Sequence, residues 1–276
     1  MAKHRPTLMF VHAHPDDEAS GGGVLARYAA EGVETVVVTC TDGRCGDGPD
    51  GVKPGEPGHD PLSVAATRRT ELANSCAILE VAHLETLGYA DSGMMGWTTN
   101  SVPGSFWGTP VAEAARRLAA LMRRYLPDVV VTYDENGYYG HPDHIQAHRI
   151  TMEAVAATRI PAKVYWSTSP HSSIAAFGAV LRELGVDWEE ARFDQHDGDP
   201  PFGLPDEQIS TKIDVRPFAR QKFDAMAAHS SQGENAELLR MGNERFTDLM
   251  GIEYFLRVYD RTGAELPETD LLAGLR

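Results

Sequence analysis

The sequence has few cysteines, comparatively few cations and no long apolar run. Its three cysteines, Cys40, Cys45 and Cys76, include no CxxC pair and are odd in number, so a disulfide framework is not expected. Lys and Arg number 25 against 40 Asp and Glu, and the net charge of −15 argues against binding to nucleic acid or to an anionic membrane. No apolar run approaches the roughly 20 residues of a membrane span, and the N-terminal residues carry no signal-peptide core. These absences predict a cytoplasmic enzyme with a small neutral substrate, and they leave open whether it forms a homo-oligomer.

Apolar, β-branched runs alternate with segments of helical spacing along the first 168 residues. Strands are predicted at 7–11, 34–41, 84–89, 128–133 and 163–168, and helices at 24–30, 63–79, 111–125 and 145–158. A strand–helix–strand order is typical of a parallel sheet. The predicted fold class is therefore α/β, a Rossmann-like, mostly parallel sheet flanked by helices.

The pattern weakens from residue 169 onward. It predicts a helix at 174–184, a strand at 209–215 and a helix at 217–229, while residues 245–259 are expected to pack back onto the core. Residues 187–207 are acidic and rich in Pro and Gly, which is typical of an insertion or lobe. We expect a catalytic core over 1–168 and a small C-terminal lobe over 169–276 that completes the substrate site within one structural domain.

Ligand-type side chains follow two of the predicted strands directly. His14, Asp16 and Asp17 follow the first, and His141, Asp143 and His144 follow the strand that ends at Tyr133. In an open α/β sheet, ligands bind beyond the carboxyl ends of the strands, where both clusters are expected. Two histidines and one carboxylate are a common catalytic zinc set with a position left open for water.

The same clusters contain groups for acid–base chemistry. Asp16 lies between two candidate ligands and could take the proton of a metal-activated water. A histidine on the opposite side could stabilise an oxyanion and protonate a leaving amine. Together these groups predict amide hydrolysis.

Two long loops could form walls of a site, and the first of them leaves the same predicted edge of the sheet as the first motif. The loop at 42–61 is rich in Gly, Pro and Asp, and the loop at 90–110 carries Asp91, Met94 and Trp97. Loops of this length inside a domain are usually functional or disordered. Packing beneath the loop is the simpler explanation of its aromatic and Met residues, and a substrate wall is the alternative.

The paired motifs, Ala13 to Glu18 and His141-Pro142-Asp143-His144, resemble the PIG-L/LmbE family of zinc-dependent N-acetylglucosaminyl deacetylases. That family includes the deacetylase of mycothiol biosynthesis and the related mycothiol S-conjugate amidase. The resemblance extends to Arg68-x-x-Glu71-Leu72, to Asp91-Ser92-Gly93-Met94 and to Ala228-His229-Ser230-Ser231-Gln232. It implies removal of an N-acetyl group from a glucosamine-type sugar conjugate.

The resemblance also implies roles for individual residues. Zinc, or alternatively ferrous iron, would be held by His14, Asp17 and His144. Asp16 would be the general base, and His141 the electrophilic or acid partner, tuned by Asp143. The substrate would meet Tyr139, which would help to polarise the carbonyl, together with Arg68, Asp91 and Met94. The loop residue Arg44 is a further candidate for substrate binding because of its place in the loop, not because of the resemblance.

One position departs from the family pattern. Relatives usually carry a Glu after the Gly in the loop that follows the second strand, whereas this chain has Arg44 there. The reversed charge weakens any specific assignment to a mycothiol precursor. The nearest alternative is an amidase that cleaves a larger acyl amide from the same kind of sugar.

Two alternatives belong to other functional classes. Gly21-Gly22-Gly23 before a helix suggests a nucleotide-binding Rossmann module, but no GxGxxG follows the first strand, and Asp16, Asp17 and Glu18 would repel a phosphate. A pseudoenzyme is the other alternative, and the presence of every expected ligand and of the base argues against it.

Overall fold

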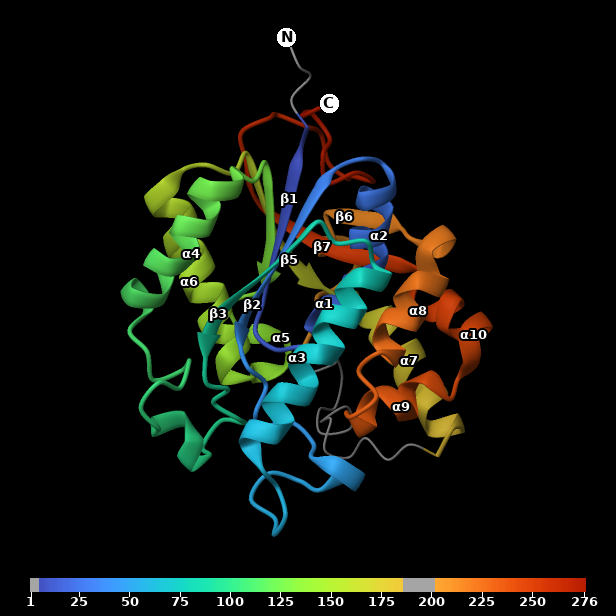
Figure 1. Cartoon of the computed structure of the whole chain (residues 1–276). Helices are drawn as coiled ribbons and strands as arrows, with labels where there is room; N and C mark the ends of the chain where they lie inside the picture. The colour runs from blue at the N-terminus through green and yellow to red at the C-terminus, as the bar shows by residue number, and fades with distance from the viewer. Residues whose placement is uncertain (1–4, 186–201) are drawn as a thin grey trace.

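The computed structural model describes residues 5–185 and 202–276, and their strands form a single sheet (Figure 1). The strands are β1 (Thr7–His12), β2 (Glu34–Thr41), β3 (His83–Tyr89), β4 (Val129–Tyr133), β5 (Lys163–Thr168), β6 (Thr211–Asp214) and β7 (Ile252–Asp260). The sheet has seven strands in the order β3-β2-β1-β4-β5-β7-β6. Strands β1 to β5 pair in parallel, whereas β7 is antiparallel to both β5 and β6. This confirms the predicted fold class, a mostly parallel α/β sheet.

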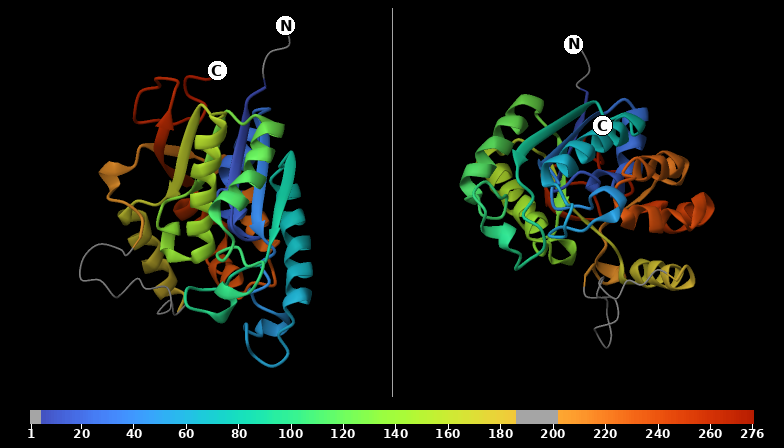
Figure 2. Two further views of the ribbon diagram at one scale, coloured as in Figure 1. Left: turned by 90° about the vertical axis from the view of Figure 1, so that its left-hand side faces the viewer. Right: turned by 60° about the horizontal axis from the view of Figure 1, so that its bottom comes forward.

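Helices cover both faces of the sheet (Figures 1 and 2). They are α1 (Asp17–Ser20), α2 (Gly22–Ala30), α3 (Pro61–Ile78), α4 (Val111–Tyr125), α5 (Gly137–Gly140), α6 (Pro142–Thr158), α7 (His171–Glu183), α8 (Ala219–Ala227), α9 (Gly233–Leu239) and α10 (Gly242–Met250). Helices α4 and α6 cover one face, and α2, α3 and α8 cover the other. None of the helices in the described ranges is long and apolar enough to cross a membrane.

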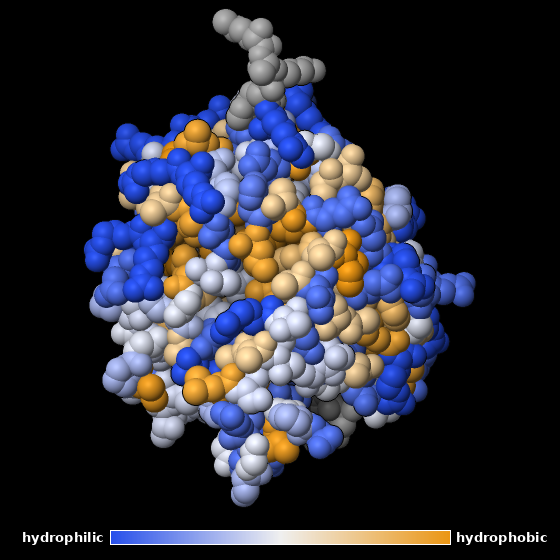
Figure 3. All heavy atoms as spheres, in the orientation of Figure 1, coloured by the Kyte–Doolittle hydropathy of each residue, from blue (hydrophilic) through white to orange (hydrophobic). Residues whose placement is uncertain are grey.

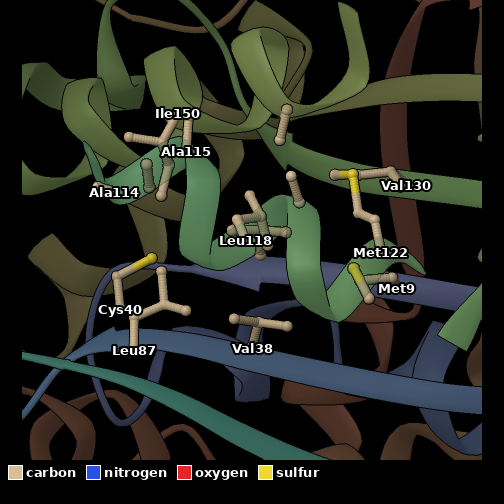
Figure 4. Close-up of a cluster of buried hydrophobic side chains, with 14 of the residues drawn as sticks. Met9, Val38, Cys40, Leu87, Ala114, Ala115, Leu118, Met122, Val130 and Ile150 are labelled. Carbon is tan, nitrogen blue, oxygen red and sulfur yellow. The ribbon is translucent and has the colours of Figure 1, made fainter. Parts of the chain in front are cut away.

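The strand patterns follow from burial on both faces. All six residues of β1 are buried, and alternate side chains contribute to two different apolar clusters. Figure 4 shows the cluster beneath α4, where Leu118 and Met122 pack against Met9 and Val38. The face shown in Figure 3 is mixed, with hydrophilic residues around its margin and apolar ones between them. Because apolar side chains pack on both faces of the sheet, the core fixes where the strands end, and these strand ends position the site.

The observed secondary structure differs from the prediction in several places, among them the short helices α1 and α5, which were not predicted. Helix α6 begins at Pro142 rather than at residue 145, because proline is well suited to the first helical position. Residues 252–260 form β7, a strand that the sequence pattern did not identify, and helices α9 and α10 were not predicted either. Strands β6 and β7 extend the core sheet itself, so the part of the chain after residue 168 is continuous with it. Residues 187–201 of the expected insertion lie outside the described residues.

A buried ionic cluster fixes the C-terminal segment to the beginning of β5. Glu268 accepts hydrogen bonds from Lys163 Nζ, from Tyr165 OH at 2.7 Å and from Arg257 Nη1 at 2.8 Å. Lys163 and Glu268 are both buried, so removal of the carboxylate would leave an unpaired buried ammonium.

We predict that Glu268→Ala lowers the free energy of unfolding by about 3–5 kcal/mol, the usual effect of breaking a buried ion pair. The exposed Glu265 of the same segment is the matched control, and Glu265→Ala should lie within about 0.5 kcal/mol of the parent protein. Urea unfolding measures both variants. Equal stability of the two would contradict a structural role for the cluster.

Candidate active site

Strands β1 and β4 are neighbours, and their carboxyl ends bring the two motifs together. The register pairs Phe10 with Val131, so the segments that leave both strands emerge side by side. His14 and Asp17 follow β1, while His144 lies in the first turn of α6. The ring atoms His144 Nε2 and His14 Nδ1 lie 3.3 Å apart. The expected meeting of the two clusters is therefore observed.

The carboxylate of Asp17 completes this group of donor atoms. Asp17 Oδ2 lies 3.5 Å from His14 Nδ1, and Asp17 Oδ1 lies 3.6 Å from His144 Nε2. Two imidazole nitrogens and a carboxylate are ligands that suit zinc or ferrous iron. The donor chemistry thus fits a divalent cation, and the ligand atoms of His14, His141 and His144 also lie within 4.8 Å of one another.

Hydrogen bonding separates His141 from the other two histidines. His141 is the N-cap of α6, and its Nδ1 accepts a hydrogen bond from the Asp143 N–H at 3.1 Å. The neutral ring therefore carries its proton on Nε2, which makes that atom a donor rather than a metal ligand. Burial and the charges of His14 and His144 hold the pKa of His141 well below its usual range, so the ring stays neutral. This geometry favours Asp17 as the third ligand.

Both candidate ligands of the first motif are held in place by further hydrogen bonds. Asp17 Oδ2 accepts from the His14 N–H at 2.7 Å and from Tyr133 OH at 2.6 Å. On the other side of the His14 ring, Nε2 lies 3.3 Å from Asp143 Oδ2, which also accepts the Ser92 N–H. A carboxylate behind a ligating histidine fixes its tautomer and its orientation. Asp143 was expected to tune His141, but its carboxylate contacts His14 and only its backbone amide contacts His141.

Asp16 has an unusual backbone conformation and a perturbed carboxylate. Its φ of 117° and ψ of −25° lie in a region that a non-glycine residue seldom adopts, at a cost of about 1–3 kcal/mol. Burial raises the pKa of Asp16 to about 6, although the nearby Arg68 guanidinium acts in the opposite direction. Arg68 Nη2 donates to Asp16 Oδ2 at 2.9 Å. A carboxylate with a pKa near neutrality is well suited to exchange protons at physiological pH.

The residues predicted to contact substrate lie in different environments. The Arg68 side chain is only 5% exposed and donates to the backbone oxygens of Gly43 and Pro15 as well as to Asp16. Asp91 is buried, and its two oxygens accept the N–H groups of Cys45 and Gly93. Both side chains are thus engaged by protein groups and support the site from within.

The remaining predicted contacts are more accessible. Tyr139 is 46% exposed, and the centre of its ring lies 5.1 Å from that of His144. Met94 begins an exposed apolar stretch of the loop that follows Asp91. Arg44 is partly exposed and donates from Nε to Asp42 Oδ2 at 2.9 Å. Tyr139, Met94 and Arg44 are therefore the predicted substrate contacts that a ligand could reach.

Three further buried residues support the candidate ligands and Asp16, and no role for them was predicted from the sequence. Tyr133 OH bridges the Ala13 N–H and Asp17, at 2.8 Å and 2.6 Å. Glu18 accepts the Asp16 N–H at 2.9 Å, and His229 Nε2 lies 2.6 Å from the other Glu18 oxygen. The position of Tyr133 as the last residue of β4 is the one local signal that could have indicated its role.

We predict that Tyr133→Phe weakens zinc binding by about 10- to 100-fold, because partners that orient a ligand usually contribute that much to metal affinity. Tyr28 is a matched control, since its OH donates to Asp270 at 2.7 Å and accepts the Leu271 N–H at 2.7 Å. Tyr28→Phe removes the same two bonds at a distant place and should leave zinc affinity unchanged. Competition with a chromogenic chelator measures both, and equal affinities would refute the role of Tyr133.

Comparison with known proteins agrees with this geometry. A family model described as "PIG-L: GlcNAc-PI de-N-acetylase" matches residues 9–155, which include both motifs. The chain belongs to the PIG-L family. It is 40% identical over 289 residues to the 1D-myo-inositol 2-acetamido-2-deoxy-alpha-D-glucopyranoside deacetylase of Geodermatophilus obscurus, with 97% of each chain covered. It is 41% identical over 280 residues to the protein of the same name from Acidothermus cellulolyticus, covering 98% of this chain and 95% of that one. The resemblance inferred from the motifs is thereby confirmed.

Solved structures share the fold of this PIG-L family member. The N,N'-diacetylchitobiose deacetylase from Pyrococcus horikoshii superposes with a TM-score of 0.57 at 20% identity, covering 91% of this chain and 83% of that one. GalB, the 4-carboxy-2-hydroxymuconate hydratase of Pseudomonas putida KT2440, gives 0.61 at 18% identity, covering 95% and 99%. Because a hydratase shares this architecture, the reaction must be argued from the site rather than from the fold.

Proposed function

We propose that this chain is a metal-dependent N-deacetylase that hydrolyses the acetyl amide of a glucosamine-type sugar conjugate. The observation that carries the proposal is the arrangement of Asp16, a partly buried carboxylate with a pKa of about 6, beside the converging donors of His14, Asp17 and His144. The names of the relatives, which describe acetamido-sugar deacetylases, support the substrate class.

His14, Asp17 and His144 would hold zinc, or ferrous iron as the alternative. When bound there, the ion supplies Lewis acidity, which makes a water more acidic and polarises an amide carbonyl. His14 is kept in a single tautomer by Asp143, and Asp17 is kept in place by Tyr133. The protein thus supplies a preorganised set of donors.

Asp16 and His141 would carry the proton transfer and the charge stabilisation. Asp16 Oδ2 is bound to Arg68, which leaves Oδ1 to accept the proton of the attacking water and to deliver it to the leaving amine. His141, with its proton on Nε2, would donate a hydrogen bond to the oxyanion as a neutral ring. Tyr139, which is 46% exposed and has its ring beside that of His144, would add a second donor through its hydroxyl. In this scheme Asp16, rather than His141, protonates the amine.

Release of free amine from a panel of zinc-loaded reactions tests the substrate class. The panel contains N-acetylglucosamine, its inositol conjugate, N,N'-diacetylchitobiose and a cysteinyl-glucosamine amide with an alkylated thiol. We expect release from an acetylated sugar. Release from the cysteinyl amide alone would instead assign the chain to the larger-acyl amidase reaction, and release from no member would refute the proposal.

A further inference from the structure

Glu18 lies at the centre of a buried cluster that touches the backbone of Asp16. One Glu18 oxygen accepts the Asp16 N–H at 2.9 Å, and the other lies 2.5 Å from Ser75 Oγ and 2.6 Å from His229 Nε2. Glu18, Ser75 and His229 are all 0% exposed. They come from α1, from α3 and from the turn after α8, three segments that pack together (Figure 1). Because the cluster is buried, neither solvent nor substrate would reach it. Any effect of the cluster on catalysis must therefore act through other protein groups.

Asp16 is the group through which the cluster would act. Its backbone is held at φ 117°, and the direction of its side chain depends on that conformation. Glu18 holds its backbone amide, the Ala19 N–H donates to its backbone oxygen at 3.0 Å, and Arg68 holds its carboxylate oxygen Oδ2. Loss of the Glu18 contact would let the backbone relax toward a common conformation, and the carboxylate would move away from the ligands beside it.

Ser75 and His229 hold Glu18 in the orientation that this contact needs. His229 donates from Nε2 to the same Glu18 oxygen that accepts from Ser75, which leaves the second oxygen directed at Asp16. The motif that contains His229 also braces the neighbouring loop, because Gln232 Oε1 accepts the Asp47 N–H at 3.1 Å. The C-terminal part of the chain therefore contributes to the geometry of a residue near the N-terminus.

We infer that Glu18, oriented by Ser75 and His229, is a positioning residue that holds Asp16 in its strained, active conformation. The inference rests on the proposed function only in treating Asp16 as the base. It assigns no contact with substrate or metal to Glu18. It requires that the loss of Glu18 affects the chemical step more than substrate binding or metal binding.

Glu18→Leu tests this inference, with Glu253→Leu as its matched control, because leucine leaves no oxygen to accept a backbone N–H. Glu253 is also a buried glutamate that accepts two backbone N–H groups, those of Gly23 and Val24, and one cation, Lys222. We expect Glu18→Leu to lower kcat by about 10²-fold, as small misplacements of catalytic groups do, with KM and zinc content nearly unchanged. Glu253→Leu should leave kcat within about twofold of the parent protein.

Two further measurements keep the test decisive. Ser75→Ala retains the carboxylate and should give a smaller loss of kcat in the same direction, which covers the case in which Glu18→Leu does not fold. A crystal structure of Glu18→Leu should show Asp16 out of the positive-φ region. Equal kcat for Glu18→Leu and Glu253→Leu, or an unchanged Asp16 backbone, would overturn the inference. An inactive parent protein would refute the proposed function instead, while the Asp16 conformation would still be tested crystallographically.

Discussion

Asp16→Asn lowers kcat for deacetylation by about 10³-fold, because an amide cannot take the proton of the attacking water. Asn has the shape of Asp and tolerates positive φ, so the backbone conformation at φ 117° should persist. The proposed metal ligands are untouched, and the zinc content should equal that of the parent protein. Steady-state kinetics together with metal analysis measures both quantities.

Asp50 provides the control for this substitution. It is exposed in the loop between β2 and α3 and also has a positive φ, of 58°. Asp50→Asn makes the same chemical change at a comparable backbone position and should leave kcat unaltered. A rate for Asp16→Asn within about tenfold of the parent would rule out Asp16 as the base, since a positioned base usually contributes at least 10²-fold.

His144→Ala produces the second large effect, a loss of zinc affinity of more than about 10²-fold. Groups that merely orient a ligand contribute 10- to 100-fold, and a ligand itself should contribute more. Turnover should fall with the metal content and recover in part at high zinc concentration. Chelator competition gives the affinity directly, independent of activity.

His148 is the control on the same helix. It lies one turn further along α6, is buried, and its Nδ1 lies 3.0 Å from the backbone oxygen of Tyr133. His148→Ala removes a buried imidazole that is not among the proposed ligands, so zinc affinity should stay close to that of the parent. If both variants lost zinc equally, the assignment of His144 as a ligand would not stand.

The sequence allowed prediction of those features that depend on local pattern. Buried, β-branched strands are recognisable from composition alone, and parallel strands place their carboxyl ends at one edge. This is why His14 and His144 could be expected to meet although they lie 130 positions apart in the chain. The ligand types at the strand ends predict a metal site, and the acid–base groups beside them predict amide hydrolysis.

Features that depend on tertiary contacts could not be predicted from the sequence. Arg68 resembles a substrate-binding residue by motif, but only the packing of α3 against the Pro15 and Gly43 backbone shows that its guanidinium is buried. The Asp143 carboxylate contacts the Nε2 atom of His14, and this contact depends on how the His14 ring is oriented in the folded protein. Strand β7 lies between β5 and β6 in the sheet. The residue pattern of one strand does not encode its place in the order of the sheet.

The strained backbone of Asp16 was equally hidden. A Pro-Asp-Asp-Glu run permits several turn conformations, and the observed one depends on Glu18, Ser75 and His229, which are brought together by α1, α3 and the segment after α8. Strain at functional residues persists only where the surroundings impose it. Local sequence could therefore identify Asp16 as a candidate base but could not identify the residues that hold it.

Metal dependence of turnover is the most direct test of the central claim. Protein stripped of metal by a chelator is assayed on an acetylated glucosamine conjugate that the parent protein cleaves, then reloaded with zinc or with ferrous iron under anaerobic conditions. We predict that stripped protein releases neither acetate nor amine, and that reloading restores both in equal amounts. Undiminished release by the stripped protein would contradict a mechanism built on His14, Asp17 and His144.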